Sequence, residues 1–292
     1  MRIIFILLVI IFLCSGSCLA LDWKNLHERA DKTSVEESVP AVENDPGSID
    51  SLYLLGLVYL NAHRDIEARE AFGRMLEISP QEVAAKWGIA EVLRRQHKPD
   101  ESEGILDEII ILSPGFAPAL ITKAYIRYTK FDFDAAIRYS QRAINLGSSK
   151  VDLTNYVRAN LMIAGAKGML AHYGGIFSKV IDGTGVFPRL KKAESMQPES
   201  AAVLFGVGSF YLLAPKFAGG GNMDKAIEYL ERAVAADPLF ANIYVRLAQA
   251  YKIKGDTDKY NALLNKALEI DPGNELANDI KSGTCRFICV PG

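Results

Sequence analysis

The sequence predicts an all-α fold, a solenoid of stacked antiparallel helix pairs over most of its 292 residues. The main observation is a period: prolines recur every 34 residues at Pro46, Pro80 and Pro114, and again at Pro238 and Pro272. Each proline follows a helical stretch that ends in a polar or acidic turn. Proline does not continue a helix, so it terminates each unit. A fixed period of this length is typical of a helical repeat protein.

The composition is the second observation, and it fits a folded globular chain. Hydrophobic residues make up 49% and charged residues 23% of the sequence, which is neither a disordered nor a fibrous composition. The 33 basic residues against 35 acidic ones give a net charge of -2. The chain therefore has no basic field to attract nucleic acid, and no nucleic-acid partner is expected.

Residues 1–20 have the pattern of a secretory signal. Arg2 precedes an apolar run that is too short to span a bilayer comfortably, and small residues follow it up to Ala20. We expect cleavage after Ala20, so that the mature chain begins at Leu21 and is exported to the periplasm.

Processing at Cys18 is the alternative, and it would leave a lipid anchor on the envelope membrane. Bacterial lipoprotein signals usually carry an aliphatic residue three positions before that cysteine, where this chain has Ser15. The rest of the sequence holds no second long apolar run. A membrane is therefore an expected partner only if Cys18 is lipidated.

Residues between the prolines also recur in register. Small residues at these positions let two antiparallel helices approach closely, and larger ones fill the space around the crossing. The recurring residues are Leu52, Leu55, Gly56, Tyr59, Ala68, Phe72 and Met75, then Ala136, Ala143, Ala226, Leu230 and Ala233, and finally Tyr244, Leu247, Ala248, Tyr251, Tyr260, Leu264 and Ala267. This pattern resembles the tetratricopeptide repeat family. The resemblance implies a right-handed superhelical solenoid without catalytic function.

The repeat frame divides the mature chain into one solenoid over 21–282 and a tail over 283–292. Two segments, 172–185 and 215–221, are glycine-rich and are expected to be lengthened inter-helix turns that lie near each other and cover one end of a groove. The predicted units lie near 21–47, 49–82, 83–116, 117–150, 151–200, 201–240 and 241–274, with a capping helix at 274–282.

The tail carries the close pair Cys285 and Cys289, a disulfide candidate in an exported protein. On a regular helix their β-carbons would lie about 6 Å apart, whereas a disulfide needs about 3.5–4.5 Å. We therefore expect the helix to end near Gly283. A zinc site would need two further ligands that the neighbouring sequence lacks.

No set of residues forms a recognisable catalytic, metal or cofactor motif. The four histidines are scattered, and His63 and His97, 34 residues apart, are expected to be solvated residues of equivalent inter-helix turns. The glycines near 183–185 and 219–221 do not match the spacing of a nucleotide-binding loop. We therefore expect no catalytic residue, no metal and no cofactor.

The family resemblance implies that the first helix of each unit lines a concave groove. The lysine and asparagine with which some relatives clamp a peptide carboxylate are absent, and the groove is predicted to be aromatic and aliphatic. Such a surface either binds a partner, namely another protein or an apolar peptide segment, or is packed as core. The predicted groove residues are Tyr53, Leu57, Trp87, Arg94, Ile121, Tyr125, Tyr128, Phe205, Leu212 and Gln249.

A narrower resemblance concerns residues 210–233, FYLLAPKFAGGGNMDKAIEYLERA. This stretch is similar to a segment of the periplasmic T-component proteins of certain tripartite solute transporters. It implies an alternative function, an accessory transport component that binds a small apolar ligand or a solute-binding protein.

Overall fold

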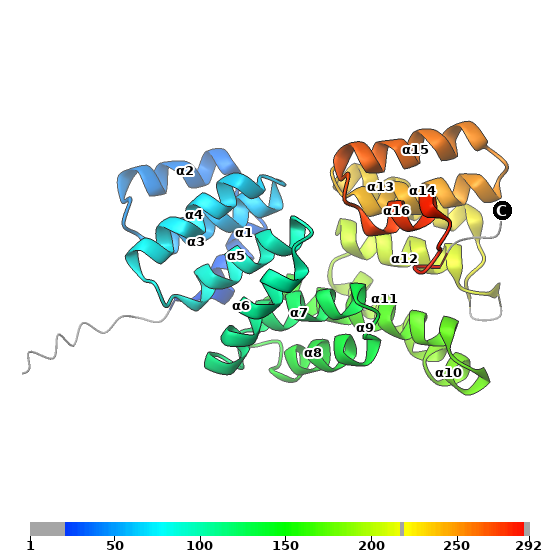
Figure 1. The fold of residues 1–292 in the computed structure, drawn as a ribbon, viewed down its shortest axis with the longest axis horizontal. Helices are drawn as coiled ribbons and strands as arrows, with labels where there is room; N and C mark the ends of the chain where they lie inside the picture. Colours follow the sequence, from blue (N-terminus) through cyan, green and yellow to red (C-terminus); the bar gives the residue numbers. More distant parts are fainter. Residues whose placement is uncertain (1–20, 217–218, 289–292) are drawn as a thin grey trace, which may run out of the picture.

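The chain is helical throughout the part that the computed structural model describes, residues 21–216 and 219–288 (Figure 1). These residues form no β-strand, and the predicted all-α fold is confirmed. The predicted signal (1–20), with Cys18, lies outside the described residues, as does Cys289. The elements are α1 Trp23–Ala30, α2 Val35–Asn44, α3 Ile49–Asn61, α4 Asp65–Ile78, α5 Val83–Arg95, α6 Pro99–Leu112, α7 Ala117–Thr129, α8 Phe133–Asn145, α9 Leu153–Tyr173, α10 Ile176–Ile181, the 3-10 helix η1 Gly183–Gly185, α11 Val186–Met196, α12 Ala201–Leu213, α13 Met223–Ala236, α14 Ala241–Ile253, α15 Thr257–Ile270 and α16 Glu275–Ser282.

Local sequence determines where the helices begin and end. Helix α3 begins after Ser48, whose hydroxyl accepts a hydrogen bond from the backbone N–H of Ser51 at 3.2 Å, the usual arrangement of an N-cap. Helix α4 ends at Ile78, two residues before Pro80. Because the period of the prolines sets these ends, helix pairs of nearly equal length follow one another along the chain.

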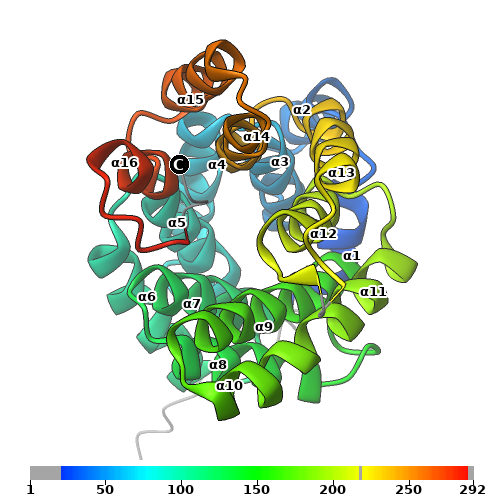
Figure 2. The same cartoon turned by 90° about the vertical axis from the view of Figure 1, so that its right-hand side faces the viewer.

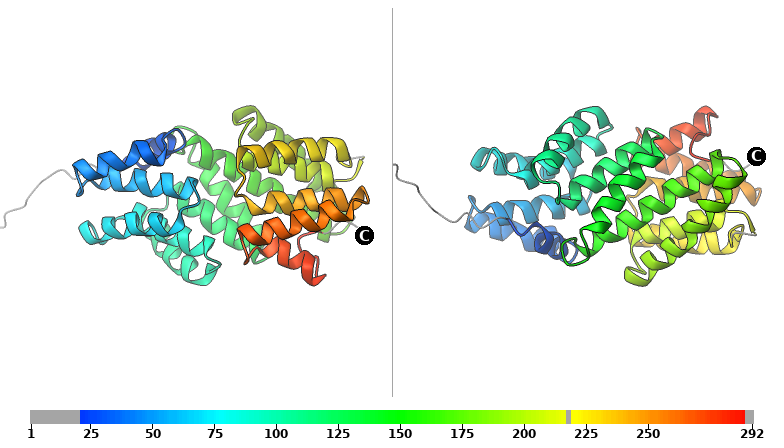
Figure 3. Two further views of the ribbon diagram at one scale, coloured as in Figure 1. Left: turned by 90° about the horizontal axis from the view of Figure 1, so that it is seen from above. Right: turned by 90° about the horizontal axis from the view of Figure 1, so that it is seen from below.

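The helix pairs form two layers. Helices α3, α5, α7, α12 and α14 form the inner layer, and α4, α6, α8, α13 and α15 cover them from outside (Figures 1 and 2). Helix α9 is longer than the others, with 21 residues. It contacts α7 and α8 on one side and α11 and α12 on the other, and thereby joins the first half of the solenoid to the second (Figure 3).

The core between neighbouring pairs depends on close approach at glycine. Phe72 of α4 is fully buried and its ring lies against Gly56 of α3 and Gly88 of α5. A β-carbon at Gly56 would lie 2.5 Å, and one at Gly88 2.4 Å, from an atom of this ring, which is too close for any larger residue. The recurring small and large residues of the sequence are thus complementary halves of one packing arrangement.

The glycine-rich segment 172–185 differs from the lengthened turn that the sequence predicts. Most of it is helical, because α9 continues to Tyr173 and α10 and η1 follow after a break at Gly174. A β-carbon at Gly174 would lie 2.3 Å from the β-carbon of Ser178. The glycine therefore permits a sharp change of direction, and the chain resumes a helix immediately.

The two histidines of the inter-helix turns are partly exposed to solvent, as the sequence predicts, but each also contacts a carboxylate of a distant turn. His63 Nε2 lies 3.0 Å from Asp237 Oδ2, and His97 Nε2 lies 2.7 Å from Asp271 Oδ1. Both contacts join residues 174 positions apart. The helices are arranged in a ring (Figure 2), and these two contacts, called the clasp below, close it.

Arg95 orients one half of the clasp. Its Nη2 lies 3.2 Å from His63 Nδ1, and a guanidinium only donates hydrogen bonds, so Nδ1 is the acceptor. The proton of a neutral His63 is therefore on Nε2, which donates it to Asp237. Burial alone would raise the pKa of Asp237, but the hydrogen bond from His63, together with that from the backbone N–H of Leu239, outweighs it and lowers that pKa.

The clasp should make a measurable but small contribution to stability. The side chains of His97 and Asp271 are about one third exposed, and ion pairs of this exposure contribute about 0.2–1 kcal/mol. We expect a double-mutant cycle with His97→Ala and Asp271→Ala, read by urea unfolding, to give a coupling energy of about 0.5–1 kcal/mol. The exposed pair Lys254 and Asp224 serves as a control with a smaller coupling. A coupling of zero would show that the contact of His97 with Asp271 does not stabilise the closed ring.

Candidate functional site

The inner layer encloses one large cavity. Its volume is about 1900 Å³, and its lining comes from α5, α7, α9, α11, α12 and α14 together with the end of the tail. The lining is mostly apolar. Parts of both segments that were predicted to cover a groove, 172–185 and 215–221, line this cavity through residues such as Val180 and Pro215. The cavity is the candidate functional site.

Aromatic side chains form one wall of the cavity. Phe187 of α11 stacks on Phe210 of α12 with ring centroids 5.0 Å apart. Phe205, also on α12, lies 5.2 Å from Phe240, which precedes α14. Three of these rings are only half-buried, and Phe210 is buried. Large rigid rings at such positions bury apolar area at little entropic cost, so this wall is suited to an apolar ligand.

A polar network occupies the opposite wall, on α5 and α7. Arg94 donates two hydrogen bonds to Glu91, at 3.0 and 2.6 Å, and its guanidinium lies 4.4 Å from the centre of the Tyr125 ring. Burial alone would raise the pKa of Glu91, but the charge and hydrogen bonds of Arg94 outweigh it and lower that pKa. Burial raises the pKa of Tyr125 to about 12. The network therefore presents an ion pair and a neutral phenol to the cavity.

Two further polar groups in the lining are available to a ligand. Arg158 of α9 is exposed and makes no hydrogen bond or ion pair with any residue that the structure describes. The hydroxyl of Ser209 on α12 is buried and, among the described residues, has no hydrogen-bond partner. A buried polar group without a partner is costly, so a ligand that supplies one would gain affinity.

Six of the ten predicted groove residues line the cavity. They are Trp87, Arg94, Ile121, Tyr125, Tyr128 and Phe205. Trp87 and Ile121 are 3% and 7% exposed, so they contribute little surface. The other four are half-buried. Whether any of them binds a ligand stays a prediction.

The remaining four predicted residues are packed as core and do not reach the cavity. Tyr53 is fully buried, and its hydroxyl lies 2.9 Å from Nε2 of His27 on α1. Leu57 follows Tyr53 by one turn of α3 and is also buried. Leu212 packs between helices, and Gln249 is covered by the tail. Of the two alternatives that the sequence left open, the core alternative holds at these positions, because α1 covers Tyr53, the tail covers Gln249, and Leu212 packs in the cluster around α12.

The repeat frame did not predict three cavity residues that lie outside the regular positions of the repeat. Phe187, Arg158 and Phe240 line the cavity but lie where the 34-residue period is interrupted or at the residue before an inner helix. One signal was available: Phe116 and Phe240 both follow a proline by two residues and precede an inner helix. The equivalence of these two positions would have indicated an aromatic residue that packs at the start of the inner helix α14, although Phe116 itself is buried and does not line the cavity.

The tail begins where the sequence predicts that the helix ends. Gly283 adopts a left-handed conformation with φ of 75° after α16, as is common at helix ends. Cys285 is disulfide-bonded. Its predicted partner, Cys289, lies outside the described residues, so the proposed pairing of these two cysteines stays a prediction.

The described residues carry neither a metal-ligand cluster nor a membrane-spanning helix. Among them no group of three or more histidine, cysteine, aspartate or glutamate side chains is placed to hold a metal ion. In the same part of the chain, no helix combines the length and the apolar character needed to cross a membrane.

Comparison with known proteins finds similarity to tetratricopeptide repeat proteins in both sequence and fold. Residues 211–275 match the family model of the tetratricopeptide repeat. In the crystal structure of the APC/C hetero-tetramer Cut9-Hcn1, the matching chain has a TM-score of 0.58 at 18% identity, over 88% of this chain and 47% of that one. This chain thus spans about half the length of that relative. No curated protein matches the sequence.

A second solved structure is similar over almost its full length. It is a tetratricopeptide repeat protein from Parabacteroides merdae, with a TM-score of 0.53, 14% identity, and coverage of 89% of this chain and 97% of that one. Identities this low show the fold alone. Neither the family model nor these structures supports the narrower resemblance to transporter T-components. Residues 211–275 therefore carry tetratricopeptide repeat sequence, and the described chain has the all-helical solenoid fold of tetratricopeptide repeat proteins.

Proposed function

We propose that this protein is an exported, non-catalytic scaffold that holds an apolar segment of a partner protein in its cavity. The observation that carries the proposal is the cavity of about 1900 Å³ with its aromatic wall. Pockets for small molecules usually measure about 300–1,000 Å³. A space of twice that size fits several side chains of a peptide segment better than it fits one small ligand.

The polar groups of the lining support a peptide as the ligand. Arg158 and the hydroxyl of Ser209 can bind main-chain carbonyl oxygens, and the half-buried rings of Phe187 and Phe205 can hold apolar side chains. A partner in which apolar side chains alternate with main-chain amides matches this arrangement. Export rests on the signal-like residues 1–20, with cleavage before Leu21 and lipidation at Cys18 as the alternative.

A small apolar ligand is the second candidate, in the role of an accessory component of a solute transporter. The enclosure of the cavity favours it, because the clasp closes the ring and Val180 and Pro215 line one end. A ligand held inside such a ring would be shielded from water on the sides that the helices cover.

Photo-crosslinking tests the scaffold proposal. The mature chain, with a photoreactive amino acid in place of Phe205, is irradiated in its own envelope fraction. We expect a discrete protein adduct from this position and none from the matched position Ile111, which is 80% exposed on the outer layer. Equal crosslinking at both positions would contradict the use of the cavity. A co-purified small molecule in native mass spectrometry, without a protein adduct, would support the second candidate.

The same site gives a prediction for affinity. Phe205→Ala should weaken binding of the crosslinked partner by about tenfold or more, because aromatic residues at the centre of an interface often contribute 2 kcal/mol or more. Ile111→Ala should leave the Kd unchanged. Melting temperatures of both variants show whether the fold is intact. An unchanged Kd for a folded Phe205→Ala variant would contradict the prediction.

A further inference from the structure

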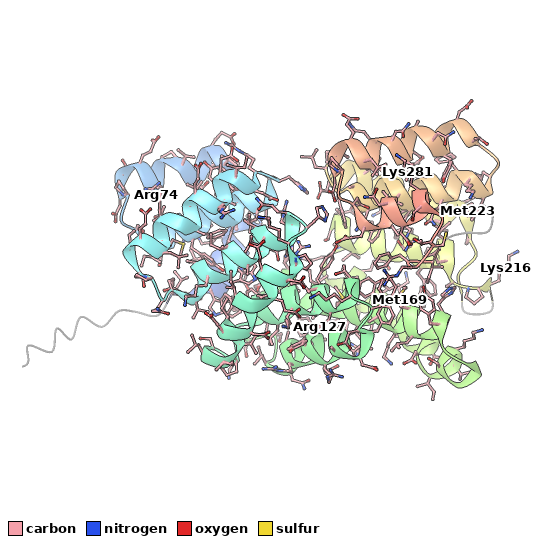
Figure 4. The ribbon with its side chains drawn as sticks, viewed as in Figure 1. Arg74, Arg127, Met169, Lys216, Met223 and Lys281 are labelled. Carbon is pink, nitrogen blue, oxygen red and sulfur yellow. The ribbon has the colours of Figure 1, made fainter. Side chains whose placement is uncertain are left out.

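The tail returns from the end of α16 to the cavity. Residues 284–288 descend from α16 toward α7 and α9 (Figure 2), and Phe287 and Ile288 line the cavity. Both side chains pack against a buried cluster that includes Met169 of α9, which lies beneath this region in Figure 4. The tail is therefore part of the site, although the repeat frame does not include it.

One buried carboxylate shapes the tail. Asp279 of α16 accepts hydrogen bonds from the backbone N–H groups of Arg286 at 2.9 Å and Phe287 at 2.8 Å, and from the hydroxyl of Thr284 at 2.6 Å. Burial would raise the pKa of Asp279, but these hydrogen bonds outweigh it and keep the carboxyl ionised. The tail is thus held in one conformation at its start and delivers Phe287 into the ring.

Two inner-layer side chains bind the main chain of the tail. Arg246 of α14 donates to the carbonyl oxygens of Phe287 and Ile288, each at 3.0 Å. Gln249 orients Arg246 through a hydrogen bond of 2.7 Å. Arg246 is 6% exposed, and its Nε has no hydrogen-bond partner among the described residues. A buried guanidinium that contacts carbonyl oxygens and no carboxylate is suited to recognition of a peptide main chain.

An aromatic pocket receives the side chain of Phe287. The ring of Phe287 lies 4.7 Å from that of Phe131 and stacks on that of Tyr128 at 6.2 Å. The Phe131 ring also packs edge-on against Phe133, at 5.5 Å. These residues come from α7, α8 and the turn between them, more than 150 positions before the tail. The pocket and Arg246 together make a site for an aromatic residue in a peptide.

We propose that this site is a peptide-binding subsite of the cavity, that residues 284–288 occupy it as an internal ligand, and that a partner segment bearing an aromatic residue displaces them. The inference rests on the proposed function, because it assumes that the cavity receives a protein segment. It adds the chemistry of the ligand, which is an aromatic side chain followed by main-chain carbonyl oxygens for Arg246.

A peptide copy of the tail tests the proposal on the full-length chain. The probe is a fluorescent peptide of residues 284–288 with Cys285→Ser, and its binding is followed by anisotropy. The attached tail competes at an effective concentration on the order of millimolar. We therefore expect the peptide to bind the Phe287→Ala chain at least about tenfold more tightly than the unaltered chain. A chain with Lys281→Ala, an exposed residue of α16, should behave as the unaltered chain does.

Two controls distinguish docking in this subsite from other binding. A probe peptide that also carries Phe287→Ala should bind neither chain, and Arg246→Gln added to the Phe287→Ala chain should abolish the gain. If the Arg246→Gln chain melts early, Gln249→Ala replaces it. Equal binding to the unaltered and Phe287→Ala chains, or a gain that persists without Arg246, would overturn the proposal. Crosslinking at Phe205 would then still support the scaffold function, so the two failures are distinguishable.

Discussion

Replacing Trp87 with alanine is expected to lower the free energy of unfolding by about 3–5 kcal/mol. Trp87 is 3% exposed, its ring packs edge-on against Tyr53 and Phe116, and its indole N–H donates to the Thr122 hydroxyl at 3.0 Å. Truncation would leave a cavity among the inner helices and would remove the hydrogen bond that the Thr122 hydroxyl accepts, although this hydroxyl still donates to Glu91 at 2.9 Å. Urea unfolding followed by circular dichroism measures the change.

Tyr125 provides the matched control for Trp87. It is also an inner-layer aromatic residue, but it is half-buried and faces the cavity. Tyr125→Ala should therefore lower the free energy of unfolding by less than half as much as Trp87→Ala. Equal losses would mean that both rings are core, and Tyr125 would have to be removed from the candidate site. A fully stable Trp87→Ala variant would contradict the packing described for α1, α3 and α5.

Acidification is expected to destabilise the protein through His27. Burial, and secondarily the charge of Arg158, lowers the pKa of this imidazole from 6.5 to about 3, and its ring is enclosed by Tyr53 and Trp87. Between these two pKa values the unfolded chain binds a proton that the folded chain does not bind. Stability therefore falls as the pH decreases below 6.5 and continues to fall toward 3. At pH 4 the loss is about 3 kcal/mol, since each pKa unit corresponds to about 1.4 kcal/mol.

His27→Gln isolates this contribution, because glutamine does not titrate. Carboxyl groups with lowered pKa values, such as Glu91 and Asp279, lose their stabilising effect in both proteins as the pH falls. The difference in unfolding free energy between the two proteins should therefore change by about 3 kcal/mol between pH 7 and pH 4. A difference that stays constant over this range would show that folding does not lower the pKa of His27.

The local architecture of the solenoid could be predicted from the sequence. The spacing of Pro46, Pro80 and Pro114 located the helix ends, and the small residue at Gly56 matched the ring of Phe72. These features are readable because each repeat packs mainly on its neighbours. The relevant contacts join residues close together in the chain, and the same pattern recurs in each repeat.

The candidate site could be predicted only in part. The inner-face positions of Arg94, Tyr125 and Phe205 follow from the repeat frame, and they line the cavity. The frame gave no means to know that α1 would fill the first part of the groove and bury Tyr53. It also gave no means to place Phe287 against Phe131.

The sequence by itself determined the helices, their pairing and the identity of most inner-face residues. Only the tertiary structure decided which of these residues face open space, which are core, and how the ring closes. The physical reason is that the clasp contacts, such as His97 with Asp271, join residues 174 positions apart. Their position depends on small rotations summed over all the intervening repeats, and the irregular segment around α10 shifts that sum. A 34-residue pattern records each step of the solenoid, whereas the closure of the ring depends on the total.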